Sequence, residues 1–171
     1  MTMVSMTEGD LTEKEHDLLQ VALGVAGRAL NPVSRFHVGA AVRAANTRIY
    51  RGTFFESSSF PLGICAESAA LSAAITDGVR EFEAVAVVGG DPESTLSARP
   101  VTPCGGCRQR IFDVTGGTAR NVPVLCSNLK LSTIYRFSIS DLLPYPFSVD
   151  DLPTSVSPDP GRTRSPVRGS G

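Results

Sequence analysis

Apolar and polar residues first follow a helical period. Thr12 and Glu15 have the spacing of a helix-capping box, with a hydroxyl at the cap and a carboxylate three residues later. Apolar residues then recur at helical spacing from Leu18 to Leu30. A helix is therefore predicted after Thr12, and Asn31-Pro32 is expected to end it.

Beyond this helix, the period of the pattern changes repeatedly. Short apolar or β-branched stretches bounded by turn residues are typical of strands, and Ala- and Leu-rich stretches that end before a glycine are typical of helices. Their order predicts an α/β sandwich around a mixed sheet. The predicted elements are strands at 37–44 and 48–55, a helix at 66–76, a strand at 82–88, a helix at 104–114, and strands at 122–126 and 132–138.

Length and composition divide the chain near its end. The 171 residues fit one domain, and 42% of them are hydrophobic, which suffices for a buried core. From Pro153 the composition shifts to Ser, Pro, Gly and Arg, and such a segment buries too little apolar surface to offset its ordering entropy. We expect a catalytic domain at 1–152 and a disordered tail at 153–171.

The charge balance limits the classes of partner. The formal net charge is -1, whereas binding to a nucleic acid polymer needs clustered positive charge. No apolar run has the length of a membrane span, and Met1–Glu13 lacks the basic start and apolar stretch of a secretory signal. We expect a cytoplasmic protein that binds neither a membrane nor a nucleic acid polymer.

Cysteine spacing indicates a metal site. A Cys-x-x-Cys pair such as Cys104 and Cys107 is either a metal clip or a redox pair, since disulfides are unusual in a cytosolic chain. Cys65 supplies a third thiol, which favours metal. Cys126 is the rival fourth ligand of a purely structural zinc site, but it lies in an apolar stretch and is expected to be a core residue.

Three thiolates and one carboxylate predict hydrolytic chemistry. Three thiolates can hold zinc and leave a fourth position for water, whose pKa zinc lowers from about 15.7 to about 7. Both thiol motifs fall at predicted helix starts, where the helix dipole favours thiolate. Glu67, two residues after Cys65, is placed for general acid/base catalysis. A carboxylate that only favours the helix dipole is the alternative for Glu67.

Four blocks together resemble the small homotetrameric zinc-dependent cytidine deaminases. The resemblance covers most of residues 12–152 and implies a three-layer α/β/α sandwich around a five-stranded mixed sheet. The blocks are Ser34-Arg35-Phe36-His37-Val38-Gly39-Ala40-Ala41, then Glu56 with Phe60-Pro61-Leu62-Gly63-Ile64-Cys65-Ala66-Glu67, then Pro103-Cys104-Gly105-Gly106-Cys107-Arg108-Gln109, then Asp141-Leu142-Leu143-Pro144-Tyr145-Pro146-Phe147.

The resemblance also implies roles for individual residues. It makes Cys65, Cys104 and Cys107 the zinc ligands and Glu67 the group that shuttles protons while water attacks C4 of a cytosine ring and ammonia leaves. The implied substrate is a pyrimidine nucleoside, as in pyrimidine salvage, or a free base. The residues that the resemblance places at the substrate are Phe36 beside the pyrimidine, Phe54, Glu56 at a ribose hydroxyl, Ala66, and Phe60 and Phe147, which complete a neighbouring subunit's pocket in a homotetramer.

Plainer interpretations of these residues stay open. Glu56 has a surface carboxylate as a serious alternative, and each of the four phenylalanines has the alternative of an ordinary core aromatic. For Phe54, core filling and pocket lining are equally supported by the sequence.

Three residues depart from the family pattern, two at the sugar site and one beside the thiolates. Phe54 stands where the family usually has Asn, and Phe60 where it usually has Tyr, so the sugar site is expected to be more apolar. We therefore expect cytidine bound less tightly, a modified cytosine nucleoside, or a free base; a silent zinc-binding relative is the other alternative. Ser68 replaces the usual Arg beside the thiolates, which predicts slower turnover or a more alkaline profile unless Arg108 compensates.

Overall fold

The computed structural model describes residues 4–94, 99–117 and 121–152. This part of the chain contains both helices and strands, with short 3-10 turns (η) between some of them. The elements are β1 (Val4–Met6), η1 (Glu8–Asp10), α1 (Glu13–Ala26), β2 (His37–Ala44), β3 (Ile49–Thr53), η2 (Phe60–Leu62), α2 (Ala66–Thr76), β4 (Phe82–Gly90), α3 (Gly105–Thr115), β5 (Pro123–Asn128), β6 (Ile134–Ser138), α4 (Ile139–Leu142) and η4 (Val149–Asp151).

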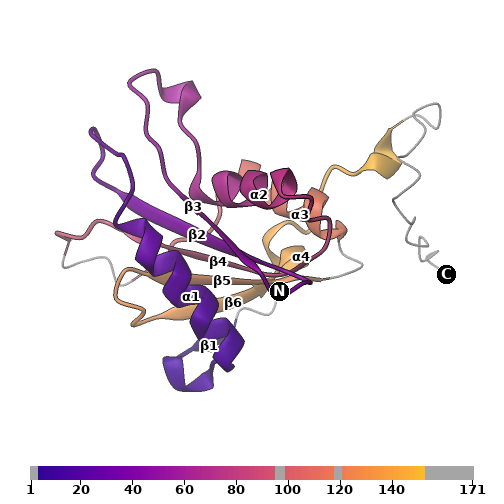
Figure 1. Ribbon diagram of the computed structural model, residues 1–171, viewed down its shortest axis with the longest axis horizontal. Helices are drawn as coiled ribbons and strands as arrows, with labels where there is room; N and C mark the ends of the chain where they lie inside the picture. Colours follow the sequence, from indigo (N-terminus) through magenta and orange to yellow (C-terminus); the bar gives the residue numbers. More distant parts are fainter. Residues whose placement is uncertain (1–3, 95–98, 118–120, 153–171) are drawn as a thin grey trace.

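The strands form one mixed sheet between two layers of helices. Their order is β1-β6-β5-β4-β2-β3, in which β4 and β5 are parallel and the other neighbouring pairs are antiparallel. Helix α1 covers one face, and α2, α3 and α4 lie on the other (Figure 1). This confirms the predicted three-layer α/β sandwich, although the sheet of the described residues has six strands rather than five.

The extra strand and one helix end differ from the sequence-based expectation. No strand was predicted before the first helix, but Val4–Met6 pairs with β6 at the edge of the sheet. Helix α1 begins at the predicted capping box, yet it ends at Ala26 rather than at Asn31-Pro32. Gly27 is the C-cap of the helix, and Leu30, further along, forms a β-bridge with Phe55 and therefore belongs to the loop.

Two further predictions concern the end of the chain and membranes. The tail predicted at 153–171 lies outside the described residues. Within the ranges that the structure does describe, no helix combines the length and the apolar character needed to cross a membrane.

The sheet is buried on both faces because its side chains alternate between two apolar clusters. In β2, Val38, Ala40 and Val42 pack with the cluster beneath α2 and α3, while Ala41 packs with the cluster beneath α1. Double-sided burial also explains the nearly continuous apolar run of β4.

One glycine lets a helix approach the sheet unusually closely. A Cβ atom added at Gly52 of β3 would lie 2.3 Å from the backbone oxygen of Ala66 and 2.4 Å from the backbone nitrogen of Ala70. Both atoms belong to the first turns of α2, so the absence of a side chain at Gly52 determines how near that end of α2 lies to the sheet.

Candidate active site

The predicted thiols lie at the starts of two helices on the same side of the sheet. Cys65 is the N-cap residue of α2, and Cys104 is the N-cap residue of α3. Cys107 follows in the first turn of α3 and is fully buried. The prediction that both motifs occupy helix starts is confirmed.

The three sulfur atoms have a spacing that suits a tetrahedral metal ion. The Sγ atoms of Cys65, Cys104 and Cys107 all lie within 4.8 Å of one another. The Sγ atoms of Cys65 and Cys104 are 3.8 Å apart. Zinc–sulfur bonds of about 2.3 Å at tetrahedral angles place two sulfurs about 3.8 Å apart. The donor set and its spacing therefore fit zinc, with a fourth position left for a non-protein ligand.

The two helix starts favour negative charge near the sulfurs, and a hydrogen bond between Cys65 and Cys107 shifts the pKa values of these two thiols in opposite directions. Three thiolates around a divalent ion leave one net negative charge, and the positive ends of the α2 and α3 dipoles meet it. The pKa of Cys65 is lowered, chiefly by a hydrogen bond from Cys107. The same bond, together with burial, raises the pKa of Cys107. A bound metal ion deprotonates such thiols outright.

Cys126 does not join this group. It lies on β5 with no exposed surface and packs in the apolar cluster beneath α2 and α3. Burial raises its pKa, so it stays a neutral thiol. Among the described residues, the group of cysteines close enough to share a metal ion does not include Cys126. This supports its expected place in the core and argues against a structural zinc site with four cysteine ligands.

Glu67 is a buried carboxyl group beside the thiols. It occupies the first turn of α2 and is 4% exposed. Burial raises its pKa, while its interactions with Cys107 and Arg110 act in the opposite direction. A buried carboxyl group with a raised pKa, next to a metal-binding group, has the features of a general acid/base.

Ser68 and Arg108 differ in how they relate to the sulfurs. The Ser68 Oγ lies 3.6 Å from the Cys107 Sγ, so its hydroxyl can donate to that sulfur. The Arg108 guanidinium instead donates to the Pro103 carbonyl oxygen at 2.8 Å and to the Leu142 carbonyl oxygen at 3.0 Å. Arg108 thus stabilises the turn before Cys104, and its hydrogen bonds go to carbonyl and hydroxyl oxygens rather than to a thiolate.

Phe36 and Phe54 are placed on the face of the sheet that carries the sulfurs. Val38, two residues after Phe36, packs in the cluster beneath α2 and α3, and Gly52, two residues before Phe54, faces α2. The two-residue period of a strand assigns both phenylalanines to that face. Both are half-buried, and neither belongs to an apolar cluster of the described residues, which favours pocket lining over core filling.

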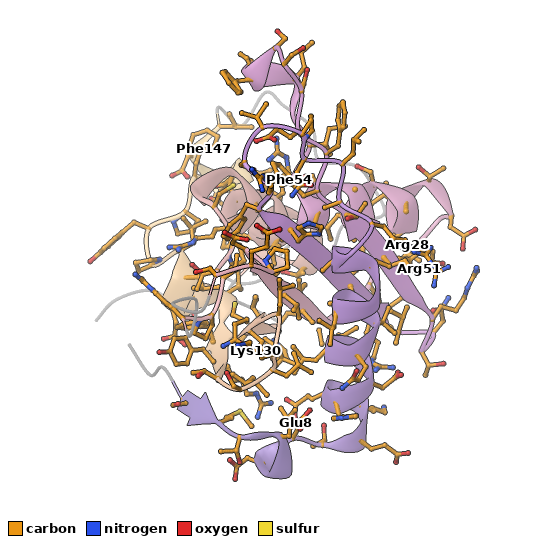
Figure 2. All side chains as sticks on the ribbon, turned by 90° about the vertical axis from the view of Figure 1, so that its left-hand side faces the viewer. Glu8, Arg28, Arg51, Phe54, Lys130 and Phe147 are labelled. Carbon is orange, nitrogen blue, oxygen red and sulfur yellow. The ribbon has the colours of Figure 1, made fainter. Side chains whose placement is uncertain are left out.

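The remaining predicted substrate residues are spread around this face. Ala66 is fully buried at the start of α2. Phe60 and Phe147 are 71% and 61% exposed and project from two separate segments. Figure 2 shows Phe54 and Phe147 in the upper half of the molecule, with Glu8 at the opposite end.

Two contacts of the site were not anticipated from the sequence. Glu56 Oε2 accepts hydrogen bonds from the backbone N–H groups of Val33 at 2.8 Å and Ser34 at 2.9 Å. Gln109 Nε2 donates to the carbonyl oxygen of Phe147 at 2.7 Å, which ties the C-terminal segment to α3. Backbone partners carry no sequence signature, so neither contact had a signal that pattern analysis can detect.

Comparisons with known proteins agree with this geometry. A family model described as the cytidine and deoxycytidylate deaminase zinc-binding region matches residues 12–124. A cytidine deaminase of Sporosarcina psychrophila is 42% identical over 125 residues, which are 73% of this chain and 85% of the relative. The blasticidin-S deaminase of Bacillus cereus is 29% identical over 106 residues, which are 61% of this chain and 75% of the relative.

A solved structure is similar over most of the fold. The crystal structure of a cytidine deaminase from Burkholderia pseudomallei superposes with a TM-score of 0.67 at 33% sequence identity. The match covers 80% of this chain and 100% of the other chain. The similarity therefore covers most of the chain.

Proposed function

This chain belongs to the cytidine deaminase family, and on that premise we propose that it hydrolyses the C4 amino group of a cytosine nucleoside. Water is consumed, ammonia is released, and the ring becomes uracil. The main observation behind this proposal is the group of three sulfurs at a spacing that fits zinc, together with the buried carboxyl group of Glu67, two residues after Cys65. The chain is a zinc-dependent hydrolase, and the choice among cytosine substrates is the finer part of the proposal.

Zinc, when bound by Cys65, Cys104 and Cys107, supplies a Lewis acid that makes a water molecule acidic. Glu67 is placed to accept a proton from the attacking water and to deliver protons to the ring N3 and to the departing amine. Its burial supports this role, because a carboxyl group with a raised pKa can both hold and release a proton. The low exposure of Glu67 also keeps bulk water from the transferred proton.

The substrate ring is proposed to lie between the sulfurs and the aromatic face. Phe36 lies beside the pyrimidine, Phe54 lies toward the sugar, and Ala66 contributes its backbone at the start of α2. Their shared face and partial burial support this arrangement. The glutamate proposed at the sugar, Glu56, also has partners in its own chain, which are considered below.

A modified cytosine nucleoside is the second candidate substrate. A phenyl ring at Phe54 offers no hydrogen bond to a sugar hydroxyl, and the similarity to a blasticidin-S deaminase favours this alternative. A lost hydrogen bond of about 1–3 kcal/mol weakens binding by up to about a hundredfold. Unmodified cytidine is then deaminated with a high KM while zinc chemistry is intact.

A substrate panel tests the function and the two candidates together. Cytidine, deoxycytidine, cytosine and a blasticidin-type nucleoside are compared by loss of absorbance at a cytosine-sensitive wavelength, with zinc measured on the same sample. Phe54→Asn is expected to lower KM for cytidine by about tenfold or more and to leave kcat little changed. A low KM for cytidine in the unchanged chain contradicts the modified-nucleoside candidate. Zinc-loaded protein that is inert toward the whole panel contradicts the enzyme and leaves a zinc-binding relative.

A homotetramer with shared active sites is proposed from two projecting segments. The loop between β3 and α2 and the segment after α4 extend away from the sheet on different sides (Figure 1). They expose large apolar side chains, which are Phe55, Phe60, Leu62 and Ile64 on the first and Tyr145, Phe147, Val149 and Leu152 on the second. Apolar segments of this kind support contact with further copies of the chain.

Light scattering tests the assembly. We expect the mass of four chains, and Phe60→Asp is expected to reduce both the assembled fraction and turnover. A single-chain mass at full activity contradicts the shared pocket.

We also propose a cytoplasmic location, supported by the free thiols that a zinc site requires. The division of the chain at residue 152 stays a prediction.

A further inference from the structure

Glu56 ties together the two loops that border the proposed pocket. Its Oε2 atom accepts hydrogen bonds from the N–H groups of Val33 and Ser34, at 2.8 Å and 2.9 Å. Its own backbone N–H donates to the carbonyl oxygen of Leu30 at 2.7 Å. Glu56 is thereby bonded to one loop, residues 30–36, at three points over five residues.

The same bonds continue to Phe36. Its N–H donates to the Ser34 Oγ at 3.1 Å, so Ser34 is bonded both to Glu56 and to Phe36. Between them Arg35 adopts a φ of 54°, a left-handed conformation that a non-glycine residue keeps only where its surroundings enforce it. The Glu56 carboxylate contributes to that constraint by holding the residue directly before Arg35, and the Arg35 N–H itself donates to the Asn31 carbonyl oxygen at 3.1 Å.

We propose that Glu56 is a positioning residue, whose carboxylate holds the 30–36 loop so that Phe36 meets the substrate ring. The proposal rests on the deaminase function proposed above, and it gives Glu56 a role that does not depend on a sugar hydroxyl. Glu56 acts through Phe36 and not on the reacting atoms. The N–H groups of Ser34 and Val33 lower the pKa of Glu56, which agrees with a carboxylate that stays charged.

Three variants separate positioning from sugar binding. Glu56→Ala removes the acceptor of both N–H groups, whereas Glu56→Gln keeps a carbonyl oxygen that can accept them. Ser34→Ala removes the Oγ that accepts from the Phe36 N–H and that also interacts with the Glu56 carboxylate, and it keeps the Ser34 N–H that donates to Glu56. Glu93→Gln is the matched control, because Glu93 is an exposed carboxylate that pairs with Arg35 at 3.4 Å and accepts neither loop N–H.

Two readouts are measured on each variant. One is hydrogen exchange at the amides of Val33 and Ser34. The other is kcat and KM on cytidine and on 2′,3′-dideoxycytidine. The sugar of the second nucleoside lacks the 2′ and 3′ hydroxyl groups, which would donate hydrogen bonds to a carboxylate at the sugar. Positioning predicts that Glu56→Ala accelerates exchange and lowers kcat/KM about tenfold or more on both nucleosides. Glu56→Gln restores most of both, Ser34→Ala lowers kcat/KM on both, and Glu93→Gln changes nothing.

The opposite pattern overturns the proposal. If Glu56→Ala impairs only cytidine and leaves amide exchange unchanged, Glu56 is a sugar ligand and nothing more. If the zinc-loaded wild-type protein deaminates no member of the substrate panel, the proposed function fails by itself, and the exchange data still decide whether Glu56 holds the loop. Unchanged exchange in Glu56→Ala then contradicts the positioning claim independently of activity.

Discussion

Replacing Gly52 with alanine tests whether close packing of α2 on the sheet sets the active-site geometry. The added Cβ would lie 2.3 Å from the Ala66 oxygen and 2.4 Å from the Ala70 nitrogen. An ordinary carbon–oxygen contact starts at about 3.3 Å, so the start of α2 must retreat by about 1 Å. The Ala66 oxygen and the Ala70 nitrogen are backbone atoms, so no side-chain rotation relieves the contact. The retreat displaces Cys65 and Glu67, which flank Ala66 in the sequence.

Two magnitudes follow from that displacement. Overpacking of a tight contact costs about 1–3 kcal/mol of unfolding free energy. A misplacement of about 1 Å between catalytic groups lowers turnover by about a hundredfold. Urea unfolding measures the first effect, and kcat with zinc content on the same preparation measures the second.

Gly24→Ala is the matched control for this experiment. Gly24 lies within α1, and an added Cβ there meets nothing within 4 Å. Alanine in a helix interior is expected to stabilise the protein by about 0.5–1 kcal/mol and to leave kcat unchanged. A Gly52→Ala protein with wild-type stability and wild-type kcat would refute the argument that this contact positions α2.

The remaining predictions concern Ser68 and Glu56. Ser68→Ala removes the hydroxyl 3.6 Å from the Cys107 sulfur and is expected to weaken zinc affinity by about tenfold. Competition with a chromophoric chelator measures that affinity. The control Ser72→Ala, on the exposed side of α2, is expected to leave it unchanged. Equal affinity in both variants contradicts the contact. The lowered pKa of Glu56 means that its stabilisation of the loop is present above the unfolded-state value of about 4.3 and is lost as the pH falls through the lower folded-state value. Exchange at Ser34, corrected for its intrinsic pH dependence, should therefore accelerate only in acid below that value.

Much of the fold was accessible from the sequence because local signals agreed with the final packing. The helix predicted at 66–76 coincides with α2, and the strand predicted at 37–44 coincides with β2. Both carry strong periodic patterns and clear ends. In contrast, β1 has three residues, too few to show a period, and its pairing with β6 is a long-range contact.

The candidate site was only partly accessible, for a related reason. Thiols and a carboxylate have distinctive chemistry, so Cys65, Cys104, Cys107 and Glu67 stood out from their types and spacing. The two N–H groups that Glu56 accepts belong to the backbone, which every residue shares, so no residue type reveals them. The face assigned to Phe54 likewise required the register of β3 against β2 and the place of α2.

The most direct test of the whole account compares the wild-type protein with Glu67→Gln. Zinc per chain and ammonia release from the best substrate of the panel are measured on the same samples. We predict about one zinc per chain in both proteins, since the three sulfur ligands are untouched, and a loss of turnover of about 10²–10⁴-fold or more in the variant. A Glu67→Gln protein that releases ammonia at the wild-type rate, or a wild-type protein that binds no zinc, would contradict the account.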